Sequence, residues 1–245
     1  MRFSSSKKIE RVFKRLIDYT QLRKAAHYVR SAGRPNAVFI WIPKNAGTSM
    51  YRALRRYGCV KTKEAERIKY QFSQRGLVTF GHMDYPTLVD KGYISKDFDQ
   101  SAYKFCFSRD PYSRAVSTYV YLRKAEGFEE TFLEFWRNVK ENGPDPIGIH
   151  HVVGTSQCNP QVRWIENLEM DFVGRYENLA EDFGRITEEL GLPPHSLGHQ
   201  NRSKRKSSGQ YYCRETKAII EELFAEDFEY FGYPLKSDSE LLGDS

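Results

Sequence analysis

The sequence predicts a three-layer α/β fold in which a central, mostly parallel sheet is flanked by helices. Two observations favour this fold. Short apolar segments recur along the chain, and each is followed by a segment with helical periodicity. The chain of 245 residues, 40% of them hydrophobic, is long enough to bury one substantial core. We expect one main domain over residues 35–235, preceded by a basic helical segment (1–34) and followed by a flexible polar tail (236–245).

The expected strands are the apolar segments at residues 37–42, 77–82, 103–108 and 171–176. A loop, PKNAGTS, and a helical stretch at 50–58 follow the first strand. The third strand leads through Asp110 and Pro111, a natural N-cap and first helical residue, into a helix. Further helices are expected after the fourth strand, as far as about Leu190, and over about 214–231.

The N-terminal segment is strongly basic and has the spacing of an amphipathic helix over residues 6–31, ended by Gly33 and Pro35. Residues 1–34 contain ten Lys or Arg against two acidic residues, whereas the whole chain has a net charge of +6. The remainder is therefore slightly acidic, which argues against a nucleic-acid partner. The helix either packs on the domain, which we favour, or makes a peripheral contact with a membrane surface.

The cellular compartment of the protein and the redox state of its cysteines are predicted from features that the sequence lacks. The longest apolar run, 37–42, is far shorter than the roughly 20 residues of a membrane span. A secretory signal pattern is also missing, so we expect a soluble, cytoplasmic protein. Because the four cysteines are widely spaced and form no CxxC pair, neither a zinc ribbon nor a dense disulfide framework is expected. We expect the cysteines to be reduced, with one disulfide as the alternative.

The loop from Pro43 to Ser49 has the composition of a phosphate cradle. Small residues let backbone N–H groups approach an anion, and the N-terminus of the following helix adds favourable partial charge. This makes the predicted fold P-loop-like. The loop differs from the nucleotide P-loop, because Lys44 precedes Gly47 instead of following the glycines. A simple strand-to-helix turn with an incidental lysine is the alternative for this loop taken alone.

Two motifs resemble those of a known family. PKNAGTS resembles the 5′-phosphosulfate loop of sulfotransferases that use 3′-phosphoadenosine 5′-phosphosulfate (PAPS), especially the carbohydrate branch similar to heparan sulfate 2-O-sulfotransferase. Arg109, with Ser117 eight residues later, resembles that family's 3′-phosphate motif. The resemblance implies PAPS as the sulfuryl donor, with no metal ion. It also implies that the donor is bound by Lys44, Asn45, Ala46, Gly47, Thr48, Ser49, Arg109, Ser117, Arg202 and Lys204.

The resemblance also implies the catalytic residues. The segment GHMDY at 81–85 resembles the strand-end segment that carries the catalytic base in the 2-O-sulfotransferases, which assigns that role to His82. A neutral imidazole can take the proton of an attacking hydroxyl. Lys44 is expected to neutralise the leaving phosphate. A strand-end histidine satisfied by backbone groups is the alternative for His82, and the rival bases are His150, His151 and His199.

The later part of the chain carries weaker signals. GRYENL at 174–179 and HQNRSK at 199–204 resemble the late strand segment and the nucleotide-covering loop of the family. The basic cluster Arg202, Lys204, Arg205 and Lys206 closes over the 3′-phosphate, contacts an acidic acceptor, or forms a solvated face.

The sequence also bears on the acceptor and on two alternative functions of the protein. The resemblance implies a carbohydrate or another hydroxylated acceptor. Six aromatic residues are candidates for stacking on a sugar or, as we favour, for the core and its rim: Trp41, Tyr85, Tyr119, Tyr121, Trp136 and Trp164. The alternatives are a P-loop kinase or NTPase, and a non-catalytic basic module that binds RNA or membranes.

Overall fold

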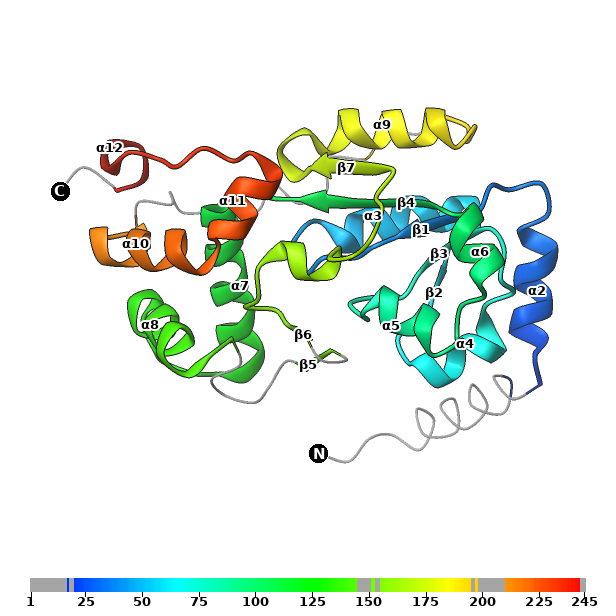
Figure 1. Cartoon of the computed structure of the whole chain (residues 1–245), viewed down its shortest axis with the longest axis horizontal. Helices are drawn as coiled ribbons and strands as arrows, with labels where there is room; N and C mark the ends of the chain where they lie inside the picture. Colours follow the sequence, from blue (N-terminus) through cyan, green and yellow to red (C-terminus); the bar gives the residue numbers. More distant parts are fainter. Residues whose placement is uncertain are drawn as a thin grey trace.

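The computed structural model describes residues 17, 20–144, 151–152, 155–194, 197 and 210–242. In these residues a five-stranded sheet forms the centre of the molecule (Figure 1), with strand order β2-β3-β1-β4-β7. All four pairs of neighbouring strands are parallel. The strands are β1 (Ala37–Phe39), β2 (Val60–Lys61), β3 (Leu77–Thr79), β4 (Tyr103–Ser108) and β7 (Phe172–Arg175). A separate antiparallel pair joins β5 (His151–Val152) to β6 (Thr155–Ser156).

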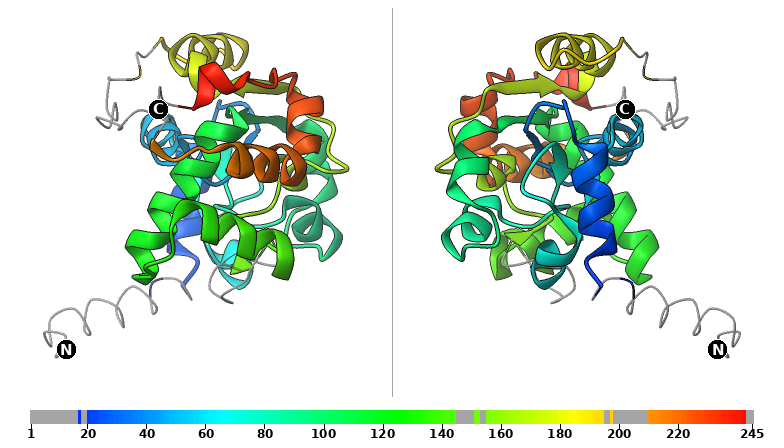
Figure 2. Two further views of the ribbon diagram at one scale, coloured as in Figure 1. Left: turned by 90° about the vertical axis from the view of Figure 1, so that its left-hand side faces the viewer. Right: turned by 90° about the vertical axis from the view of Figure 1, so that its right-hand side faces the viewer.

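Helices cover both faces of the sheet. Their bounds are α2 (Leu22–Arg30), α3 (Gly47–Leu54), α4 (Ala65–Gln71), α5 (Tyr85–Asp90), α6 (Lys96–Ser101), α7 (Pro111–Glu126), α8 (Phe132–Asn142), α9 (Leu179–Glu189), α10 (Arg214–Leu223), α11 (Ala225–Phe231) and α12 (Asp238–Leu241). Short 3₁₀ turns are η1 (Arg55–Tyr57), η2 (Gln161–Trp164) and η3 (Tyr176–Asn178). Figure 2 shows α8 and α9 on opposite sides of the molecule.

Successive side chains along β1 and the residues that follow it, 40–42, point to opposite faces of the sheet, and each face has its own core. Val38, Ile40 and Ile42 belong to the larger core, which α4 to α8 and α10 to α12 complete. Phe39 and Trp41 belong to the smaller core on the other face, together with residues of α3 and α9. The chain therefore has three layers, and the predicted fold class is confirmed.

The predicted elements differ from the observed ones in length and in several omissions, among them the helices α4, α5, α6 and α8 and the β5–β6 pair. The final helix is broken at Phe224 into α10 and α11. The edge strand β2 was not predicted, because two ladder residues in a polar segment give no readable periodicity. Of the expected N-terminal helix, α2 lies in the described part of the chain and packs against α4. In the segment predicted as a polar tail, α12 forms and Leu241 is buried.

Candidate active site

The carboxyl ends of the parallel strands bring the predicted site residues to one edge of the sheet. His82 follows β3, Lys44 follows the extension of β1, and Arg109 follows β4 directly. Lys61, the last residue of β2, joins them from the neighbouring strand. In open parallel sheets this edge is where ligands bind, because loops and helix N-termini converge there.

The loop between β1 and α3 has the backbone of an anion cradle. Lys44 and Ala46 have φ values of 70° and 61°, in the left-handed region that few residues other than glycine adopt. Helix α3 begins at Gly47, so its first N–H groups precede the intrahelical hydrogen-bond ladder. Gly47 cannot be replaced here without a shift, since a Cβ atom would lie 1.7 Å from Nε1 of Trp41.

Asn45 ties this loop to the sheet. Its side chain is buried, and its Nδ2 donates to the carbonyl of Phe107 at 2.7 Å and to Oε1 of Gln161 at 2.5 Å. Among the described residues its Oδ1 has no hydrogen-bond partner. Asn45 therefore fixes the cradle against the neighbouring strand from the interior of the protein.

Arg109 has a buried guanidinium group and follows β4 at the carboxyl edge of the sheet. Its Nε donates to Oγ of Ser113 at 2.8 Å, and its Nη1 donates to the carbonyl of Lys44 at 2.9 Å. The guanidinium carbon lies 4.2 Å from the ring centroid of Tyr176. Its buried Nη2 has no partner within the part of the chain that the structure describes. A buried cation with an uncompensated donor is suited to an anionic group such as a phosphate.

Helix α7 presents the remaining residues of the second motif. Its N-cap, Asp110, accepts a hydrogen bond from the Ser113 N–H at 2.7 Å and forms an ion pair with Lys236 at 2.8 Å. Ser117 is partly buried two turns into this helix. Farther along α7, the ring centroid of Tyr121 lies 3.9 Å from Nζ of Lys44. Helix α7 therefore contacts the cradle directly, where Tyr121 meets Lys44, and indirectly through Arg109, which donates to both Ser113 and the Lys44 carbonyl.

His82 lies on the opposite side of the cradle, with its ring edge-on to Trp41 at 5.3 Å between centroids. Its Nδ1 donates to the carbonyl of Trp41 at 2.8 Å, because a carbonyl oxygen can only accept. This bond leaves Nε2 as the unprotonated nitrogen of the neutral ring. Burial lowers the pKa of His82 to about 4; the bond to Trp41 opposes that change, and the charges of Lys61 and Lys44 reinforce it. The imidazole is therefore neutral near pH 7.

Two residues that the sequence did not single out position the site. Gln161 is fully buried, and its amide accepts from the N–H of Arg109 and donates to the carbonyl of Arg109, both at 2.9 Å. Arg114, also buried, donates to the carbonyls of Pro43, Gln157 and Asn159. Burial lowers the pKa of Arg114 and raises that of Asp227, and the opposite charge of each limits the change in the other. Their roles depend on contacts between distant segments, so no local motif marks them.

Several predicted residues are not brought into the site by the described structure. Arg202, Lys204, Arg205, Lys206, His150 and His199 lie outside the described residues, and only the backbone of His151, in β5, is described. Five of the six aromatic candidates for sugar stacking are buried: Trp41, Tyr85, Tyr119, Trp136 and Trp164. Tyr121 remains 45% exposed.

Two other features concern the described residues as a whole. They contain no group of three or more His, Cys, Asp or Glu side chains arranged to hold a metal ion. Among the described helices, none combines the length and apolar character that a bilayer span requires.

The chain is similar to proteins that are named sulfotransferases. Carbohydrate sulfotransferase 14 of Danio rerio is 27% identical over 151 residues, which is 58% of this chain and 40% of that relative. The chain therefore matches less than half the length of this curated relative. Two solved structures share the fold at a TM-score of 0.51: a sulfotransferase from Alicyclobacillus acidocaldarius (17% identity, 80% of this chain and 94% of that chain), and mouse sulfotransferase SULT7A1 complexed with PAP (18% identity, 79% and 84%).

The family model described as "Sulfotransferase family" matches residues 27–234, a span that contains the cradle, His82 and Arg109. Because this match covers most of the chain, and the parallel sheet agrees with it, the chain belongs to the sulfotransferase family.

Proposed function

We propose that the protein transfers the sulfuryl group of PAPS to a hydroxyl group of a carbohydrate, with His82 as general base. The observation that carries this proposal is the convergence of His82, the Lys44 loop and Arg109 at one edge of the sheet. An anion cradle on one side and a neutral imidazole on the other match a reaction between an anionic donor and a neutral hydroxyl.

The donor side is proposed to use the two anion-binding features separately. The backbone N–H groups at the start of α3, with the hydroxyls of Thr48 and Ser49, would hold the 5′-phosphosulfate. Arg109 and Ser117 would hold the 3′-phosphate, and the buried Nη2 of Arg109 supports this assignment because it offers an uncompensated donor. The bound donor supplies an activated sulfuryl group.

The acceptor side is proposed to use Nε2 of His82, the unprotonated nitrogen. A bond forms between the acceptor oxygen and sulfur, the bond from sulfur to the bridging oxygen of the 5′-phosphate breaks, and the hydroxyl proton moves to Nε2. The positive charges of Lys44 and Lys61 help to keep the pKa of this imidazole low in the free protein. An anionic donor offsets these charges and thereby makes His82 a stronger base.

Lys44 is proposed to neutralise the charge that develops on the leaving phosphate. Its Nζ lies over the ring of Tyr121, while its carbonyl is held by Arg109. A charge-assisted contact of this kind is worth about 1.5–3 kcal/mol, and it accelerates the reaction when it strengthens in the transition state. The carbohydrate class of the acceptor is supported by the similarity to carbohydrate sulfotransferase 14.

The experiment is a calorimetric titration with adenosine 3′,5′-bisphosphate in the absence of magnesium, with ATP and adenosine 5′-monophosphate as controls. We expect binding that requires the 3′-phosphate and weakens in Ser117→Ala by roughly threefold to tenfold, the value of one hydrogen bond. Arg109→Gln should weaken it further, while Arg185→Gln, on the exposed face of α9, should leave it unchanged. Transfer of labelled sulfate from PAPS to a panel of oligosaccharides then tests the acceptor class.

Two results would count against the proposal. A preference for magnesium-ATP over the bisphosphate would favour a kinase. Labelled transfer to phenols or lipids but to none of the oligosaccharides would retain the sulfuryl transfer and reject the carbohydrate acceptor.

A further inference from the structure

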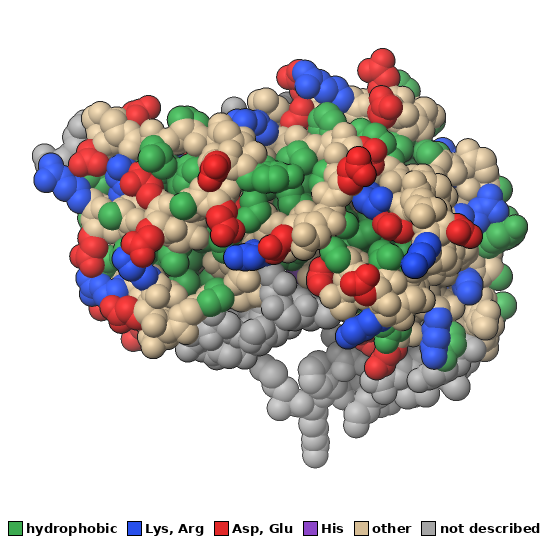
Figure 3. Space-filling view, in the orientation of Figure 1, with side chains coloured by type: hydrophobic (Ala, Val, Ile, Leu, Met, Phe, Trp, Pro, Cys, Tyr) green, Lys and Arg blue, Asp and Glu red, His purple; other side chains and the backbone are tan. Residues whose placement is uncertain are grey.

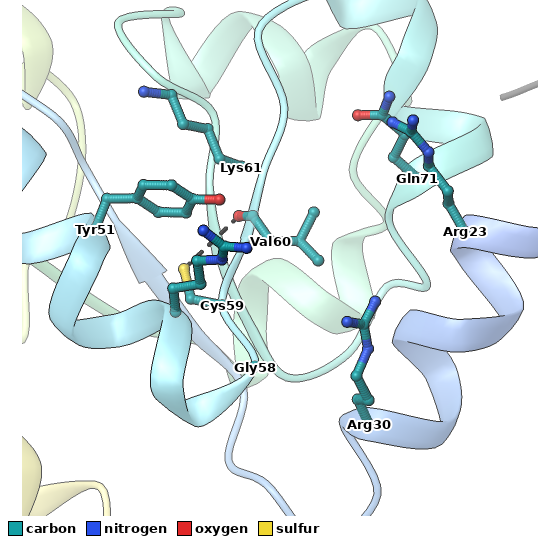
Figure 4. Close-up of a pocket in the computed structure, with 9 residues that line it drawn as sticks. Arg23, Arg30, Tyr51, Gly58, Cys59, Val60, Lys61 and Gln71 are labelled. Atoms are coloured by element: carbon teal, nitrogen blue, oxygen red, sulfur yellow. Dashed lines mark hydrogen bonds between the residues drawn. The ribbon is translucent and has the colours of Figure 1, made fainter. Parts of the chain in front are cut away.

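A cationic pocket lies beside the proposed active site, between α2, α3 and the edge strand β2 (Figure 4). Its volume is about 380 Å³, at the lower end of the range for small-molecule sites. The described lining residues are Arg23, Arg30, Tyr51, Arg55, Gly58, Cys59, Val60, Lys61 and Gln71. Figure 4 shows Arg23 and Arg30 reaching in from α2, opposite Tyr51 and Lys61.

Among the described residues that line this pocket, the charged side chains are all positive. Four of its described lining residues are Lys or Arg, and none of them is Asp or Glu. The cations come from three separate elements: α2, the η1 turn and β2. Like charges that line one pocket repel one another, and a bound anion relieves that repulsion. Burial and the adjacent Lys63 lower the pKa of Lys61 to about 8.

Lys61 connects this pocket to the active site. Its Nζ lies 3.6 Å from the ring centroid of Trp41 and 5.3 Å from that of Tyr51. The carbonyl of Trp41 in turn accepts the hydrogen bond from His82. Only Lys61 and Trp41 therefore separate an anion in the pocket from His82, the proposed base. The pocket lies on the side of His82 that is away from Arg109.

We propose that this pocket binds an oxyanion group, a phosphate or sulfate monoester, independently of the nucleotide site. Guanidinium groups recognise such groups through paired hydrogen bonds, and the Tyr51 hydroxyl adds a neutral donor. The volume leaves room for the group that carries the ester. The inference does not depend on the carbohydrate acceptor, because it concerns a binding site and its test measures binding.

The test is a phosphorus NMR titration of the protein saturated with adenosine 3′,5′-bisphosphate, so that the nucleotide cradle is filled. One arm adds inorganic phosphate and the other adds glucose 6-phosphate. We expect both probes to bind the wild type, and expect affinity to fall roughly tenfold or more in the double variant Arg30→Gln/Arg55→Gln. Tighter binding of the sugar ester assigns the pocket to a saccharide-borne anion, and equal binding assigns it to the free anion.

The matched control is Arg52→Gln/Arg56→Gln. It removes the same charge from the exposed surface of α3 and η1, and neither residue is among the described lining residues. Its affinity should equal that of the wild type. Absence of binding by both probes, or equal weakening in the two double variants, would overturn the proposal. Saturation with the bisphosphate is measured first, so failure of the nucleotide site is distinguished from failure of the pocket.

Discussion

At the scale of single residues, the position of one proton on His82 decides what the ring can do. The hydrogen bond from Nδ1 to the carbonyl of Trp41 fixes the neutral tautomer and orients the ring. The low pKa of His82 ensures that Nε2 is available as an acceptor near pH 7. The same environment that makes this histidine neutral would also weaken it as a base, unless an anionic donor is bound beside it.

Replacing His82 tests its role as base. His82→Ala should reduce turnover by about 10²–10⁴, the contribution of general base catalysis. The affinity for adenosine 3′,5′-bisphosphate should be nearly unchanged, because a base acts on the acceptor. Single-turnover transfer and calorimetric titration measure the two quantities separately.

His82→Asn is the matched control for this prediction. An asparagine amide can still donate to the Trp41 carbonyl, but it has no basic nitrogen. It should therefore be as inactive as the alanine variant. Recovery of activity in His82→Asn would mean that the histidine serves only to hold Trp41.

At the scale of secondary-structure elements, the junction between β1 and α3 depends on the close approach of Gly47 to the side chain of Trp41. Gly47 begins the helix against the indole of Trp41, and Asn45 anchors the preceding turn to β4. The cradle is therefore held from two sides, by a side chain in the interior and by a packing contact that excludes a methyl group. A small change at this junction should alter the geometry of the backbone N–H groups.

Gly47→Ala tests this junction. A Cβ at this position would overlap Trp41, so we expect a loss of stability of about 1–3 kcal/mol, typical of overpacking. Nucleotide affinity should fall as well, since the loop must shift. Urea unfolding and titration with the bisphosphate measure these effects.

Gly184→Ala provides the comparison within the same protein. Gly184 lies in α9, and a Cβ there would meet no heavy atom within 4 Å. This variant should be stabilised by roughly 1 kcal/mol, because alanine is the better helix former. If the two variants lost equal stability, the packing against Trp41 would not be the cause.

At the scale of the whole molecule, charge and burial determine the response to pH. On the face drawn in Figure 3, acidic and basic side chains are interspersed, as the near balance of charge beyond residue 34 predicts. In the interior, His27 of α2 is fully buried against the ring of Phe72, and its Nδ1 accepts a hydrogen bond from the Ser73 N–H at 3.2 Å. Burial, followed by the charge of Arg30, lowers the pKa of His27 to about 4.

We therefore predict a loss of stability on mild acidification. The unfolded chain binds a proton at each histidine near pH 6.5, whereas folded His27 resists protonation down to about 4. The free energy of unfolding should therefore decrease as the pH falls through this window, by up to about 3 kcal/mol for this histidine. Urea unfolding near neutral pH and near pH 4 measures the change.

His27→Gln should reduce that pH dependence, because glutamine can accept from Ser73 without titrating. His82, whose pKa is also lowered to about 4, should account for part of the remainder. A pH dependence in His27→Gln identical to that of the wild type would show that His27 is not responsible.

The sequence predicted the layered fold and most of the sheet, because buried parallel strands are continuous apolar segments and the intervening helices have their own period. It also indicated the cradle, His82 and Arg109, whose types and local spacing are recognisable. It missed β2, and with it Lys61, because a two-residue edge strand has too few residues for a pattern.

The tertiary structure alone decided the strand order β2-β3-β1-β4-β7, which places Lys61, His82, Lys44 and Arg109 along one edge. It also decided the contacts of Gln161, which reaches Asn45 across 116 residues of sequence and holds the backbone of Arg109. Such contacts depend on which segments meet after the sheet has assembled. Local sequence specifies the conformation of each segment, but the satisfaction of buried polar groups is determined only when the whole chain has packed.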